Sequence, residues 1–364
     1  MSARPGAEAS TNHTSCALPI GPRSTAAHSS SGSRRARSTS VTTAGVNEST
    51  KRLVCYGAVL SAADDGFHLK ATEDRSWTET AWFAAAVPER GLAVWAYPLF
   101  RHELGIMSCG IYVWEPGAEE LWQLPYYRTW WHMAIPQGAE LRDLRLPNGL
   151  SYQCLEPLTA YHISYEDGDA ISLEMTFRAL HPPHDVGVEP GGHGHLDQLG
   201  RVTGELRLNG ERIEIDCVEM RDRTWSPRRE SRQRAFVSYS YGANAGEGFH
   251  LSTRWRPDRG RDEMLTGFLL RDGGVVPLAD GTCEIDRDDL GRPVSVVVRG
   301  HGDEGTSLEV RGEVVSCIAI PSTPWFVWAC VVRWTLEDGT VVYGEHQDTW
   351  SPALLRDRVL RHRR

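Results

Sequence analysis

Two copies of a short motif place carboxyl groups beside tryptophans, where they could do acid chemistry. The first copy is RDRTWSPR at residues 221–228, and the second is QDTWSP at residues 347–352. If each copy ends a β-strand, Asp222 and Asp348 each share a strand face with the residue two positions on. A carboxyl group kept from water has a raised pKa and holds a proton at neutral pH. The motif therefore predicts either a general acid in an apolar cavity or simply a strand-end cap.

The candidate proton donors are Asp222 first, then Asp197 and Asp348, with His346 next to the second motif. Hydration of an isolated alkene needs a strong acid, which a protonated carboxyl group supplies, and a stabilised cation. Tryptophan faces stabilise cations. Arg221 or Arg228 could hold a substrate carboxylate through two hydrogen bonds. The expected substrate-binding residues are Trp82, Trp225, Trp350, Arg221, Arg228 and Glu79.

Histidines form a rival candidate site. His181, His184, His193 and His195 lie within a short stretch that ends at Asp197. In a strand, His193 and His195 would face the same way, as a metal pair requires. Their spacing matches no familiar metal motif, and neither a phosphate-binding glycine loop nor a dinucleotide fingerprint is present. We therefore expect no metal and no cofactor, with a metal-dependent enzyme using residues 181–197 kept as an alternative.

The composition is that of a globular protein. Of 364 residues, 40% are hydrophobic and 24% are charged, and the formal net charge of −9 disfavours nucleic acid as a partner. The sequence has no apolar run long enough to span a membrane. Its eight cysteines include no C-x-x-C pair, so we expect reduced thiols and a cytoplasmic location.

The elements that must position these residues are β-strands. Apolar and polar residues alternate over 171–180, and Asn209-Gly210 predicts a tight hairpin within 202–220. A long series of such strands predicts an all-β protein of two antiparallel calycin (lipocalin-like) β-barrels packed together, with a short C-terminal helix. The expected parts are an N-terminal arm outside the fold (1–50), a first barrel (52–185), a second barrel (193–352) and a tail helix (353–364).

Three runs carry a resemblance to a known family: RSWTETAWF (75–83), HLDQLGRVTGELRLNG (195–210) and RDRTWSPR (221–228). They resemble a largely uncharacterised bacterial branch related to the AttH-like family, which includes carotenoid hydratase (hydroxyneurosporene synthase). The resemblance covers about residues 70–350 and implies two calycin-like barrels. It also implies acid-promoted hydration or cyclisation of an isoprenoid or polyketide inside a barrel.

The third run departs from the wider group, where it often reads Arg-Asp-His-Ser-Trp-Gly-x-Arg. The matching positions here are Arg221, Asp222, Trp225 and Arg228. Arg223, Thr224 and Ser226 stand where the histidine, serine and glycine would be, so the motif itself offers no Asp–His pair.

We therefore expect an enzyme that acts on a hydrophobic, terpenoid-like or polycyclic small molecule by general-acid catalysis (hydration, dehydration or cyclisation). The competing interpretations are a non-catalytic carrier of the lipocalin type and the metal-dependent enzyme described above. The sequence leaves the substrate and the oligomeric state open.

Overall fold

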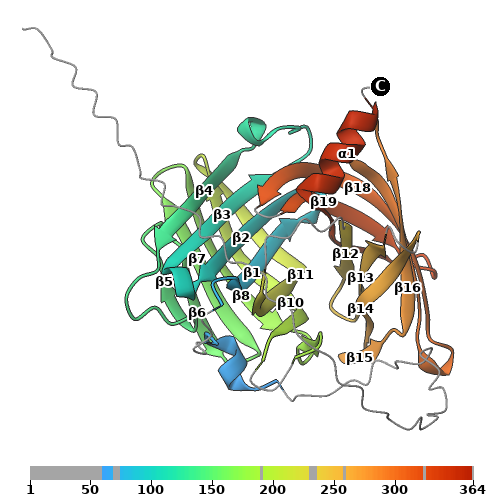
Figure 1. The fold of residues 1–364 in the computed structure, drawn as a ribbon, viewed down its shortest axis with the longest axis horizontal. Helices are drawn as coiled ribbons and strands as arrows, with labels where there is room; N and C mark the ends of the chain where they lie inside the picture. The colour runs from blue at the N-terminus through green and yellow to red at the C-terminus, as the bar shows by residue number, and fades with distance from the viewer. Residues whose placement is uncertain are drawn as a thin grey trace, which may run out of the picture. The chain divides into compact units, whose positions relative to one another are not determined.

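The computed structural model describes residues 60–68, 74–188, 192–228, 236–256, 260–322 and 325–362. They form two curled antiparallel sheets and one short C-terminal α-helix (Figure 1), which confirms the predicted all-β class. The expected arm, residues 1–50, lies outside the described residues. None of the described helices has the length and apolar character needed to cross a lipid bilayer.

The first sheet has eleven strands in the order β4-β3-β2-β1-β11-β10-β8-β7-β6-β5, with β9 paired to β10. Their bounds are β1 Trp77–Val87, β2 Leu92–Arg101, β3 Ile106–Trp114, β4 Tyr126–Ala134, β5 Asp143–Arg145, β6 Ser151–Glu156, β7 Ala160–Asp167, β8 Ile171–Ala179, β9 His184–Asp185, β10 Gly194–Leu208 and β11 Glu211–Pro227.

The second sheet has nine strands in the order β15-β14-β13-β12-β20-β19-β18-β17-β16. Their bounds are β12 Phe236–Ala243, β13 Glu247–Arg256, β14 Arg261–Arg271, β15 Gly274–Pro277, β16 Asp280–Arg287, β17 Pro293–His301, β18 Ser307–Ser322, β19 Trp325–Thr335 and β20 Val341–Trp350. The helices are η1 Ala62–Asp65, η2 Pro88–Arg90, η3 His102–Leu104, η4 Leu121–Gln123, η5 Asp303–Gly305 and α1 Pro352–His362.

The predicted local elements are present. Strand β8 follows the alternation over 171–180 and buries Ile171 and its same-face neighbours. The hairpin between β10 and β11 turns at Asn209 and Gly210, whose φ angles of 50° and 87° are both positive, as a type I′ turn requires.

The two sheets divide the chain between β11 and β12, whereas the sequence pattern predicts a boundary within the Pro- and Gly-rich stretch 178–195. That stretch connects β8 to β10 inside one sheet, so β10 and β11 belong to the first sheet. The reason is a distant pairing: the end of β11 pairs with β1 from Trp77 opposite Pro227 to Phe83 opposite Arg221. A local pattern of turn residues does not reveal such a pairing.

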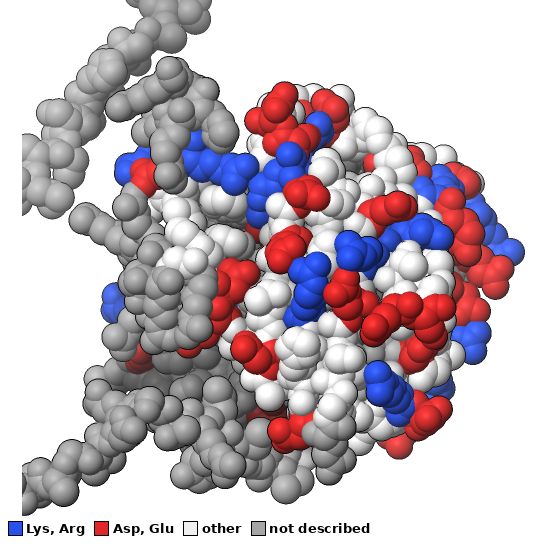
Figure 2. Space-filling model, turned by 90° about the vertical axis from the view of Figure 1, so that its right-hand side faces the viewer, with Lys and Arg blue, Asp and Glu red and all other residues white. Residues whose placement is uncertain are grey.

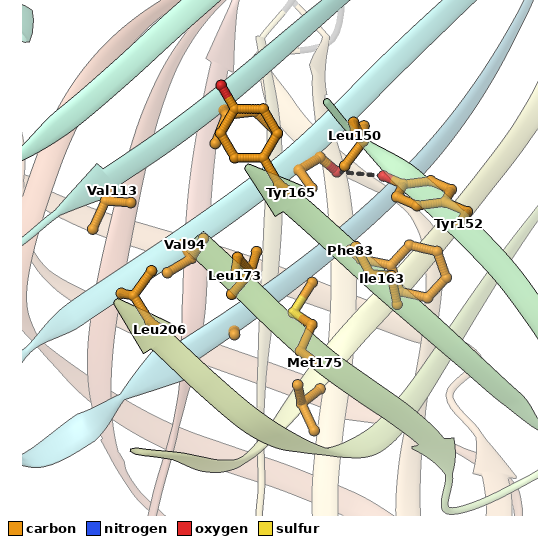
Figure 3. Packing of buried hydrophobic residues seen from close by; sticks show 14 of the residues in the cluster. Phe83, Val94, Val113, Leu150, Tyr152, Ile163, Tyr165, Leu173, Met175 and Leu206 are labelled. Atoms are coloured by element: carbon orange, nitrogen blue, oxygen red, sulfur yellow. Dashed lines mark hydrogen bonds between the residues drawn. The ribbon is translucent and has the colours of Figure 1, made fainter. Parts of the chain in front are cut away.

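Strand β1 is buried on both faces because it lies between two cores. Ala81 and Phe83 pack into the core enclosed by the first sheet, while Trp82 and Ala84 on the other face pack against the second sheet. Figure 3 shows how aromatic and aliphatic side chains of the first core pack together. The Tyr152 hydroxyl lies within hydrogen-bonding distance of the carbonyls of Ala81 (3.2 Å) and Ala96 (3.1 Å). Side chains thus fill the interior of the first sheet.

The outer surface is electrostatically mixed. Acidic and basic side chains are interspersed over the face shown in Figure 2. Exposed ion pairs among the described residues include Arg201 with Asp216 at 2.7 Å and Arg299 with Glu284 at 2.9 Å. Such exposed pairs contribute little to stability individually.

Candidate active site

A cavity of about 420 Å³ lies where the two sheets meet. Its size is typical of a small-molecule site. The sequence predicts a site inside one barrel, but strands of both sheets contribute to this lining. The aromatic side chains among the lining residues are Trp82, Trp95, Tyr97, Tyr112, Trp130, Trp131, Tyr239 and Trp325.

A histidine and two aspartates form a compact group at this cavity. His195 on β10 lies opposite Thr224 on β11, and Asp197 lies opposite Asp222. The His195 Nε2 is 3.1 Å from an Asp197 carboxylate oxygen, while its Nδ1 is 2.8 Å from Thr224 Oγ1 and 3.5 Å from Asp222 Oδ2. His195, Asp222 and Thr224 line the cavity, whereas Asp197 is fully buried behind them.

The second sheet completes the group around Asp197. The Tyr239 hydroxyl donates to Asp197 Oδ1 at 2.5 Å, and His250 Nε2 lies 3.3 Å from Asp197 Oδ2. Burial would raise the pKa of Asp197, but the charges of His195 and His250 outweigh it and hold the pKa well below its usual value. Asp197 therefore stays ionised and fixes the surrounding donors.

Two groups facing the cavity have pKa values that suit proton transfer. Burial alone would lower the pKa of His195, but the carboxylates of Asp197 and Asp222 reverse this effect and raise it to about 9. The pKa of Asp222 is raised, mainly by burial and also by Asp197, against the opposing charge of His195. Its side chain is 18% exposed and lines the cavity. His195 therefore holds a proton at neutral pH, next to a carboxyl group whose own pKa is raised.

The same group could also hold a cation. His195, Asp197 and Asp222 each offer a ligand atom, and these atoms lie within 4.8 Å of one another. One imidazole and two carboxylates suit a divalent first-row metal. Bound metal would need a neutral His195, which the raised pKa opposes at neutral pH.

The histidine cluster expected at residues 181–197 is divided. His195 and Asp197 join the site, but both ring nitrogens of His181 contact backbone: Nε2 accepts from the Leu199 N–H at 2.9 Å, and Nδ1 is 2.6 Å from the Pro182 carbonyl. His184 Nε2 instead contacts Thr266 Oγ1 at 2.9 Å. The expected metal set therefore does not assemble as one group.

In the second copy of the motif, Gln347 and Thr349 line the cavity, but Asp348 and the preceding His346 do not. Asp348 forms a buried ion pair with Arg287 and accepts from Trp350 Nε1 at 2.8 Å. His346 is fully buried and lies 2.9 Å from Ser240 Oγ, and burial lowers its pKa to about 4. Asp348 and His346 therefore contact buried partners, and neither side chain lines the cavity.

Of the six expected substrate-binding residues, Trp82 and Arg228 line the cavity. The other four do not, because buried partners hold them elsewhere. Trp225 stacks on His68 at 4.1 Å, and Trp350 stacks on Phe236 at 5.3 Å.

The remaining two charged candidates stabilise the segment before β1. Arg221 forms a buried ion pair with Asp65 and donates to Gln198 Oε1 at 3.1 Å. Glu79 forms a buried ion pair with Arg223 and accepts from the His68 backbone N–H at 2.9 Å. Because Arg221 and Glu79 are buried and paired in this way, neither is available to bind a substrate.

His195, Tyr239 and His250 were not among the expected catalytic residues, and the sequence carried a signal for the first. The Asn-Gly turn fixes Leu208 opposite Glu211, and counting eleven residues outward along each strand places Asp197 opposite Asp222. His195 is two residues from Asp197 and therefore faces the same way. No comparable local signal exists for Tyr239 and His250, because they come from the other sheet.

No curated protein matches the chain in sequence. Among solved structures, a protein described as AttH from Nitrosomonas europaea is similar with a TM-score of 0.53 at 13% identity, covering 75% of this chain and 91% of that chain. CghA with Sch210972 gives 0.53 at 13% identity, covering 76% and 88%. Kievitone hydratase from Nectria haematococca gives 0.51 at 9% identity, covering 82% and 95%.

At these identities the likeness concerns the fold, and it confirms the AttH-like resemblance at that level. The family described as "Domain of unknown function (DUF7064)" matches residues 61–351, and the chain belongs to this family.

Proposed function

We propose that the protein is an enzyme that hydrates, dehydrates or cyclises a hydrophobic, terpenoid-like or polycyclic small molecule by general-acid catalysis. The observation that carries the proposal is the Asp222–His195 pair at the wall of an aromatic cavity, 3.5 Å apart and both with raised pKa values. An acid of this kind, kept from bulk water, is what protonation of an alkene or of a leaving hydroxyl requires.

In the hydration direction, the Asp222 carboxyl donates its proton to one alkene carbon, and the π bond supplies the electron pair for the new C–H bond. The faces of Trp82 and Trp95 stabilise the resulting cation. Water then adds to the cation and loses a proton to the Asp222 carboxylate. Dehydration follows the same steps in reverse. In cyclisation a second double bond attacks the cation in place of water, and the new cation loses a proton from an adjacent carbon to the Asp222 carboxylate.

The neighbouring residues have positioning roles in this scheme. Asp197 holds the His195 ring through Nε2, and Tyr239 and His250 hold Asp197. His195, which its pKa of about 9 keeps charged at neutral pH, lies 3.5 Å from Asp222 and stabilises the Asp222 carboxylate that remains while its proton is on the substrate. The name of one structurally similar protein, kievitone hydratase, agrees with this class of reaction.

The decisive variant is Asp222→Asn. Protein is incubated in isotopically labelled water with a panel of polycyclic and isoprenoid alkenes, and products are followed by mass spectrometry. We expect the wild type to incorporate labelled oxygen and Asp222→Asn to lose at least about a hundredfold in rate. Quenching of tryptophan fluorescence should show unchanged ligand binding. Asp216→Asn is the matched control, since Asp216 lies on the same strand but is exposed and paired with Arg201.

Two results would reject the proposal in favour of the alternatives. Ligand binding without any turnover, or turnover that survives in Asp222→Asn, would indicate a carrier or a different acid. Activity that disappears after dialysis against a chelator and returns with a divalent metal would favour the metal-dependent enzyme at His195, Asp197 and Asp222.

A further inference from the structure

We infer that the cavity contains a subsite for an anionic group, formed by Arg228 and Arg254, and that its ligand is a hydrophobic acid. This inference deepens the proposed function and rests on the cavity being the ligand site. The chemical class is a molecule with an apolar ring or isoprenoid body and a carboxylate.

The first observation is the charge of the lining. Three arginines line the cavity (Arg101, Arg228 and Arg254), against a single carboxylate residue, Asp222. This excess of positive charge occurs in a protein whose formal net charge is −9. On the outer surface, by contrast, basic and acidic side chains are interspersed (Figure 2).

The second observation is that two of these guanidinium groups form no ion pair with a carboxylate among the described residues. Arginines elsewhere have carboxylates: Arg221 pairs with Asp65 in the interior, and Arg299 pairs with Glu284 at the surface. Within the part of the chain that the structure describes, Arg228 donates only to the neutral Tyr97 hydroxyl through its side chain, at 3.2 Å. Arg254 has no hydrogen-bonded or ion-paired partner there.

Partial burial of these two guanidinium groups costs free energy unless a ligand supplies an anion. Both side chains are half-buried, so each guanidinium loses part of its hydration. Arg254 gains no ion pair among the described residues, and Arg228 gains only the electrostatic attraction of Asp222, without an ion-pair contact. A carboxylate would restore this loss through charge-assisted, forked hydrogen bonds. The arginines come from different sheets, Arg228 after β11 and Arg254 on β13, so the subsite exists only where the sheets meet.

The subsite would also orient the substrate. With its anionic end at Arg228 and Arg254, the apolar body extends along the indole rings of Trp82 and Trp95, at the wall that also holds Asp222. A substrate acid bound in this way places a defined carbon next to the proton donor. A neutral molecule of the same shape would lack this fixed orientation.

The test compares two fluorescent probes that share a ring system, pyrenebutyrate and the neutral pyrenebutanol, by fluorescence anisotropy. We expect wild-type protein to prefer the acid. Arg254→Gln and Arg228→Gln should each weaken acid binding about tenfold, as loss of one charge-assisted contact does, and leave alcohol binding unchanged. Arg178→Gln is the matched control, because Arg178 is exposed, lies outside the lining and loses the same charge.

Arg254→Lys keeps the charge, so it should retain most of the preference for the acid even if the glutamine variant folds poorly. The inference is overturned if the two probes bind the wild type equally, if neither binds, or if both glutamine variants bind the acid as tightly as the wild type. Failure of the proposed function has a different signature: Asp222→Asn would keep full turnover while the preference for the acid remained.

Discussion

At the scale of single residues, the site depends on His195, which supplies the imidazole that the RDRTWSPR motif lacks. Thr224 stands where the wider group has a serine, and its hydroxyl contacts His195 Nδ1 at 2.8 Å. The Asp–His pair that the motif did not contain is therefore formed across two strands, between Asp222 and His195. Asp222 and His195 share the proton of this pair, and the charge of the buried Asp197 raises the pKa of both groups.

The protonation of His195 predicts a pH dependence of stability. Its pKa is raised from 6.5 to about 9 in the fold, so its stabilising contribution is complete below pH 6.5 and is lost as the pH rises through about 9. We expect the free energy of unfolding of the wild type to fall by up to about 3 kcal/mol over this window. In His195→Gln the fall should be much smaller, as measured by urea unfolding at a series of pH values. Equal slopes in both proteins would contradict a charged His195.

At the scale of elements, a bulge in the edge strand β4 shapes one side of the cavity. The register shifts between Met107 opposite Met133 and Cys109 opposite Trp130, so Trp131 and His132 together face one residue of β3. His132 has a φ of 58°, in the left-handed region that non-glycine residues seldom adopt. Bulges redirect side chains and interrupt edges of sheets. Both Trp131 and His132 line the cavity as a result.

The bulge predicts that Trp131 contributes to ligand binding although it is 48% exposed. We expect Trp131→Ala to weaken binding of pyrenebutanol roughly fivefold, because a ring contact worth about 1 kcal/mol is lost. Trp122→Ala is the control, since Trp122 is 75% exposed and lies outside the lining. Titrations monitored by anisotropy would measure both. If the two variants bind equally well, Trp131 is a surface residue without a part in the site.

At the scale of the whole folded unit, buried carboxyl groups link the two sheets. The Tyr241 hydroxyl on β12 donates to Glu219 Oε2 on β11 at 2.5 Å, and Trp95 Nε1 on β2 donates to Glu345 Oε1 on β20 at 2.7 Å. Burial raises the pKa of Glu219 to about 7, and burial together with Glu219 raises the pKa of Glu345 well above its usual value. These links hold Trp95, a wall of the cavity, against the opposite sheet.

The buried carboxyl groups between the two sheets predict a second effect of pH on stability, at lower pH than the effect of His195. The pKa of Glu219 rises from 4.5 to about 7 on folding. Its contribution to the free energy of unfolding is therefore complete below pH 4.5 and is lost as the pH rises through about 7. Over that window the wild type should lose about 3 kcal/mol relative to Glu219→Gln, which stays neutral and keeps an acceptor for Tyr241. Calorimetric unfolding across this range would measure it. Parallel pH profiles for the two proteins would exclude a protonated Glu219.

Features of the structure that depend on residues close in sequence could be predicted, whereas features that depend on distant pairings could not. Alternation in a strand such as residues 171–180 and the Asn209-Gly210 turn depend on neighbours in sequence, so the all-β class and the β10–β11 hairpin could be predicted. The pairing of β11 with β1 joins residues far apart in the sequence, and it placed β10 and β11 in the first sheet. Segments rich in turn residues do not distinguish a loop within a sheet from a boundary between sheets.

The sequence by itself determined the strands, their facing residues and the presence of two near-identical Asp-containing motifs. Only the tertiary structure decided which of the two aspartates faces the cavity: Asp222 lines it, whereas Asp348 is neutralised by Arg287 from a distant strand. The physical reason is that the charge state and accessibility of a carboxyl group depend on the partners and water around it. Those partners are brought together by the packing of the two sheets and not by the local order of residues.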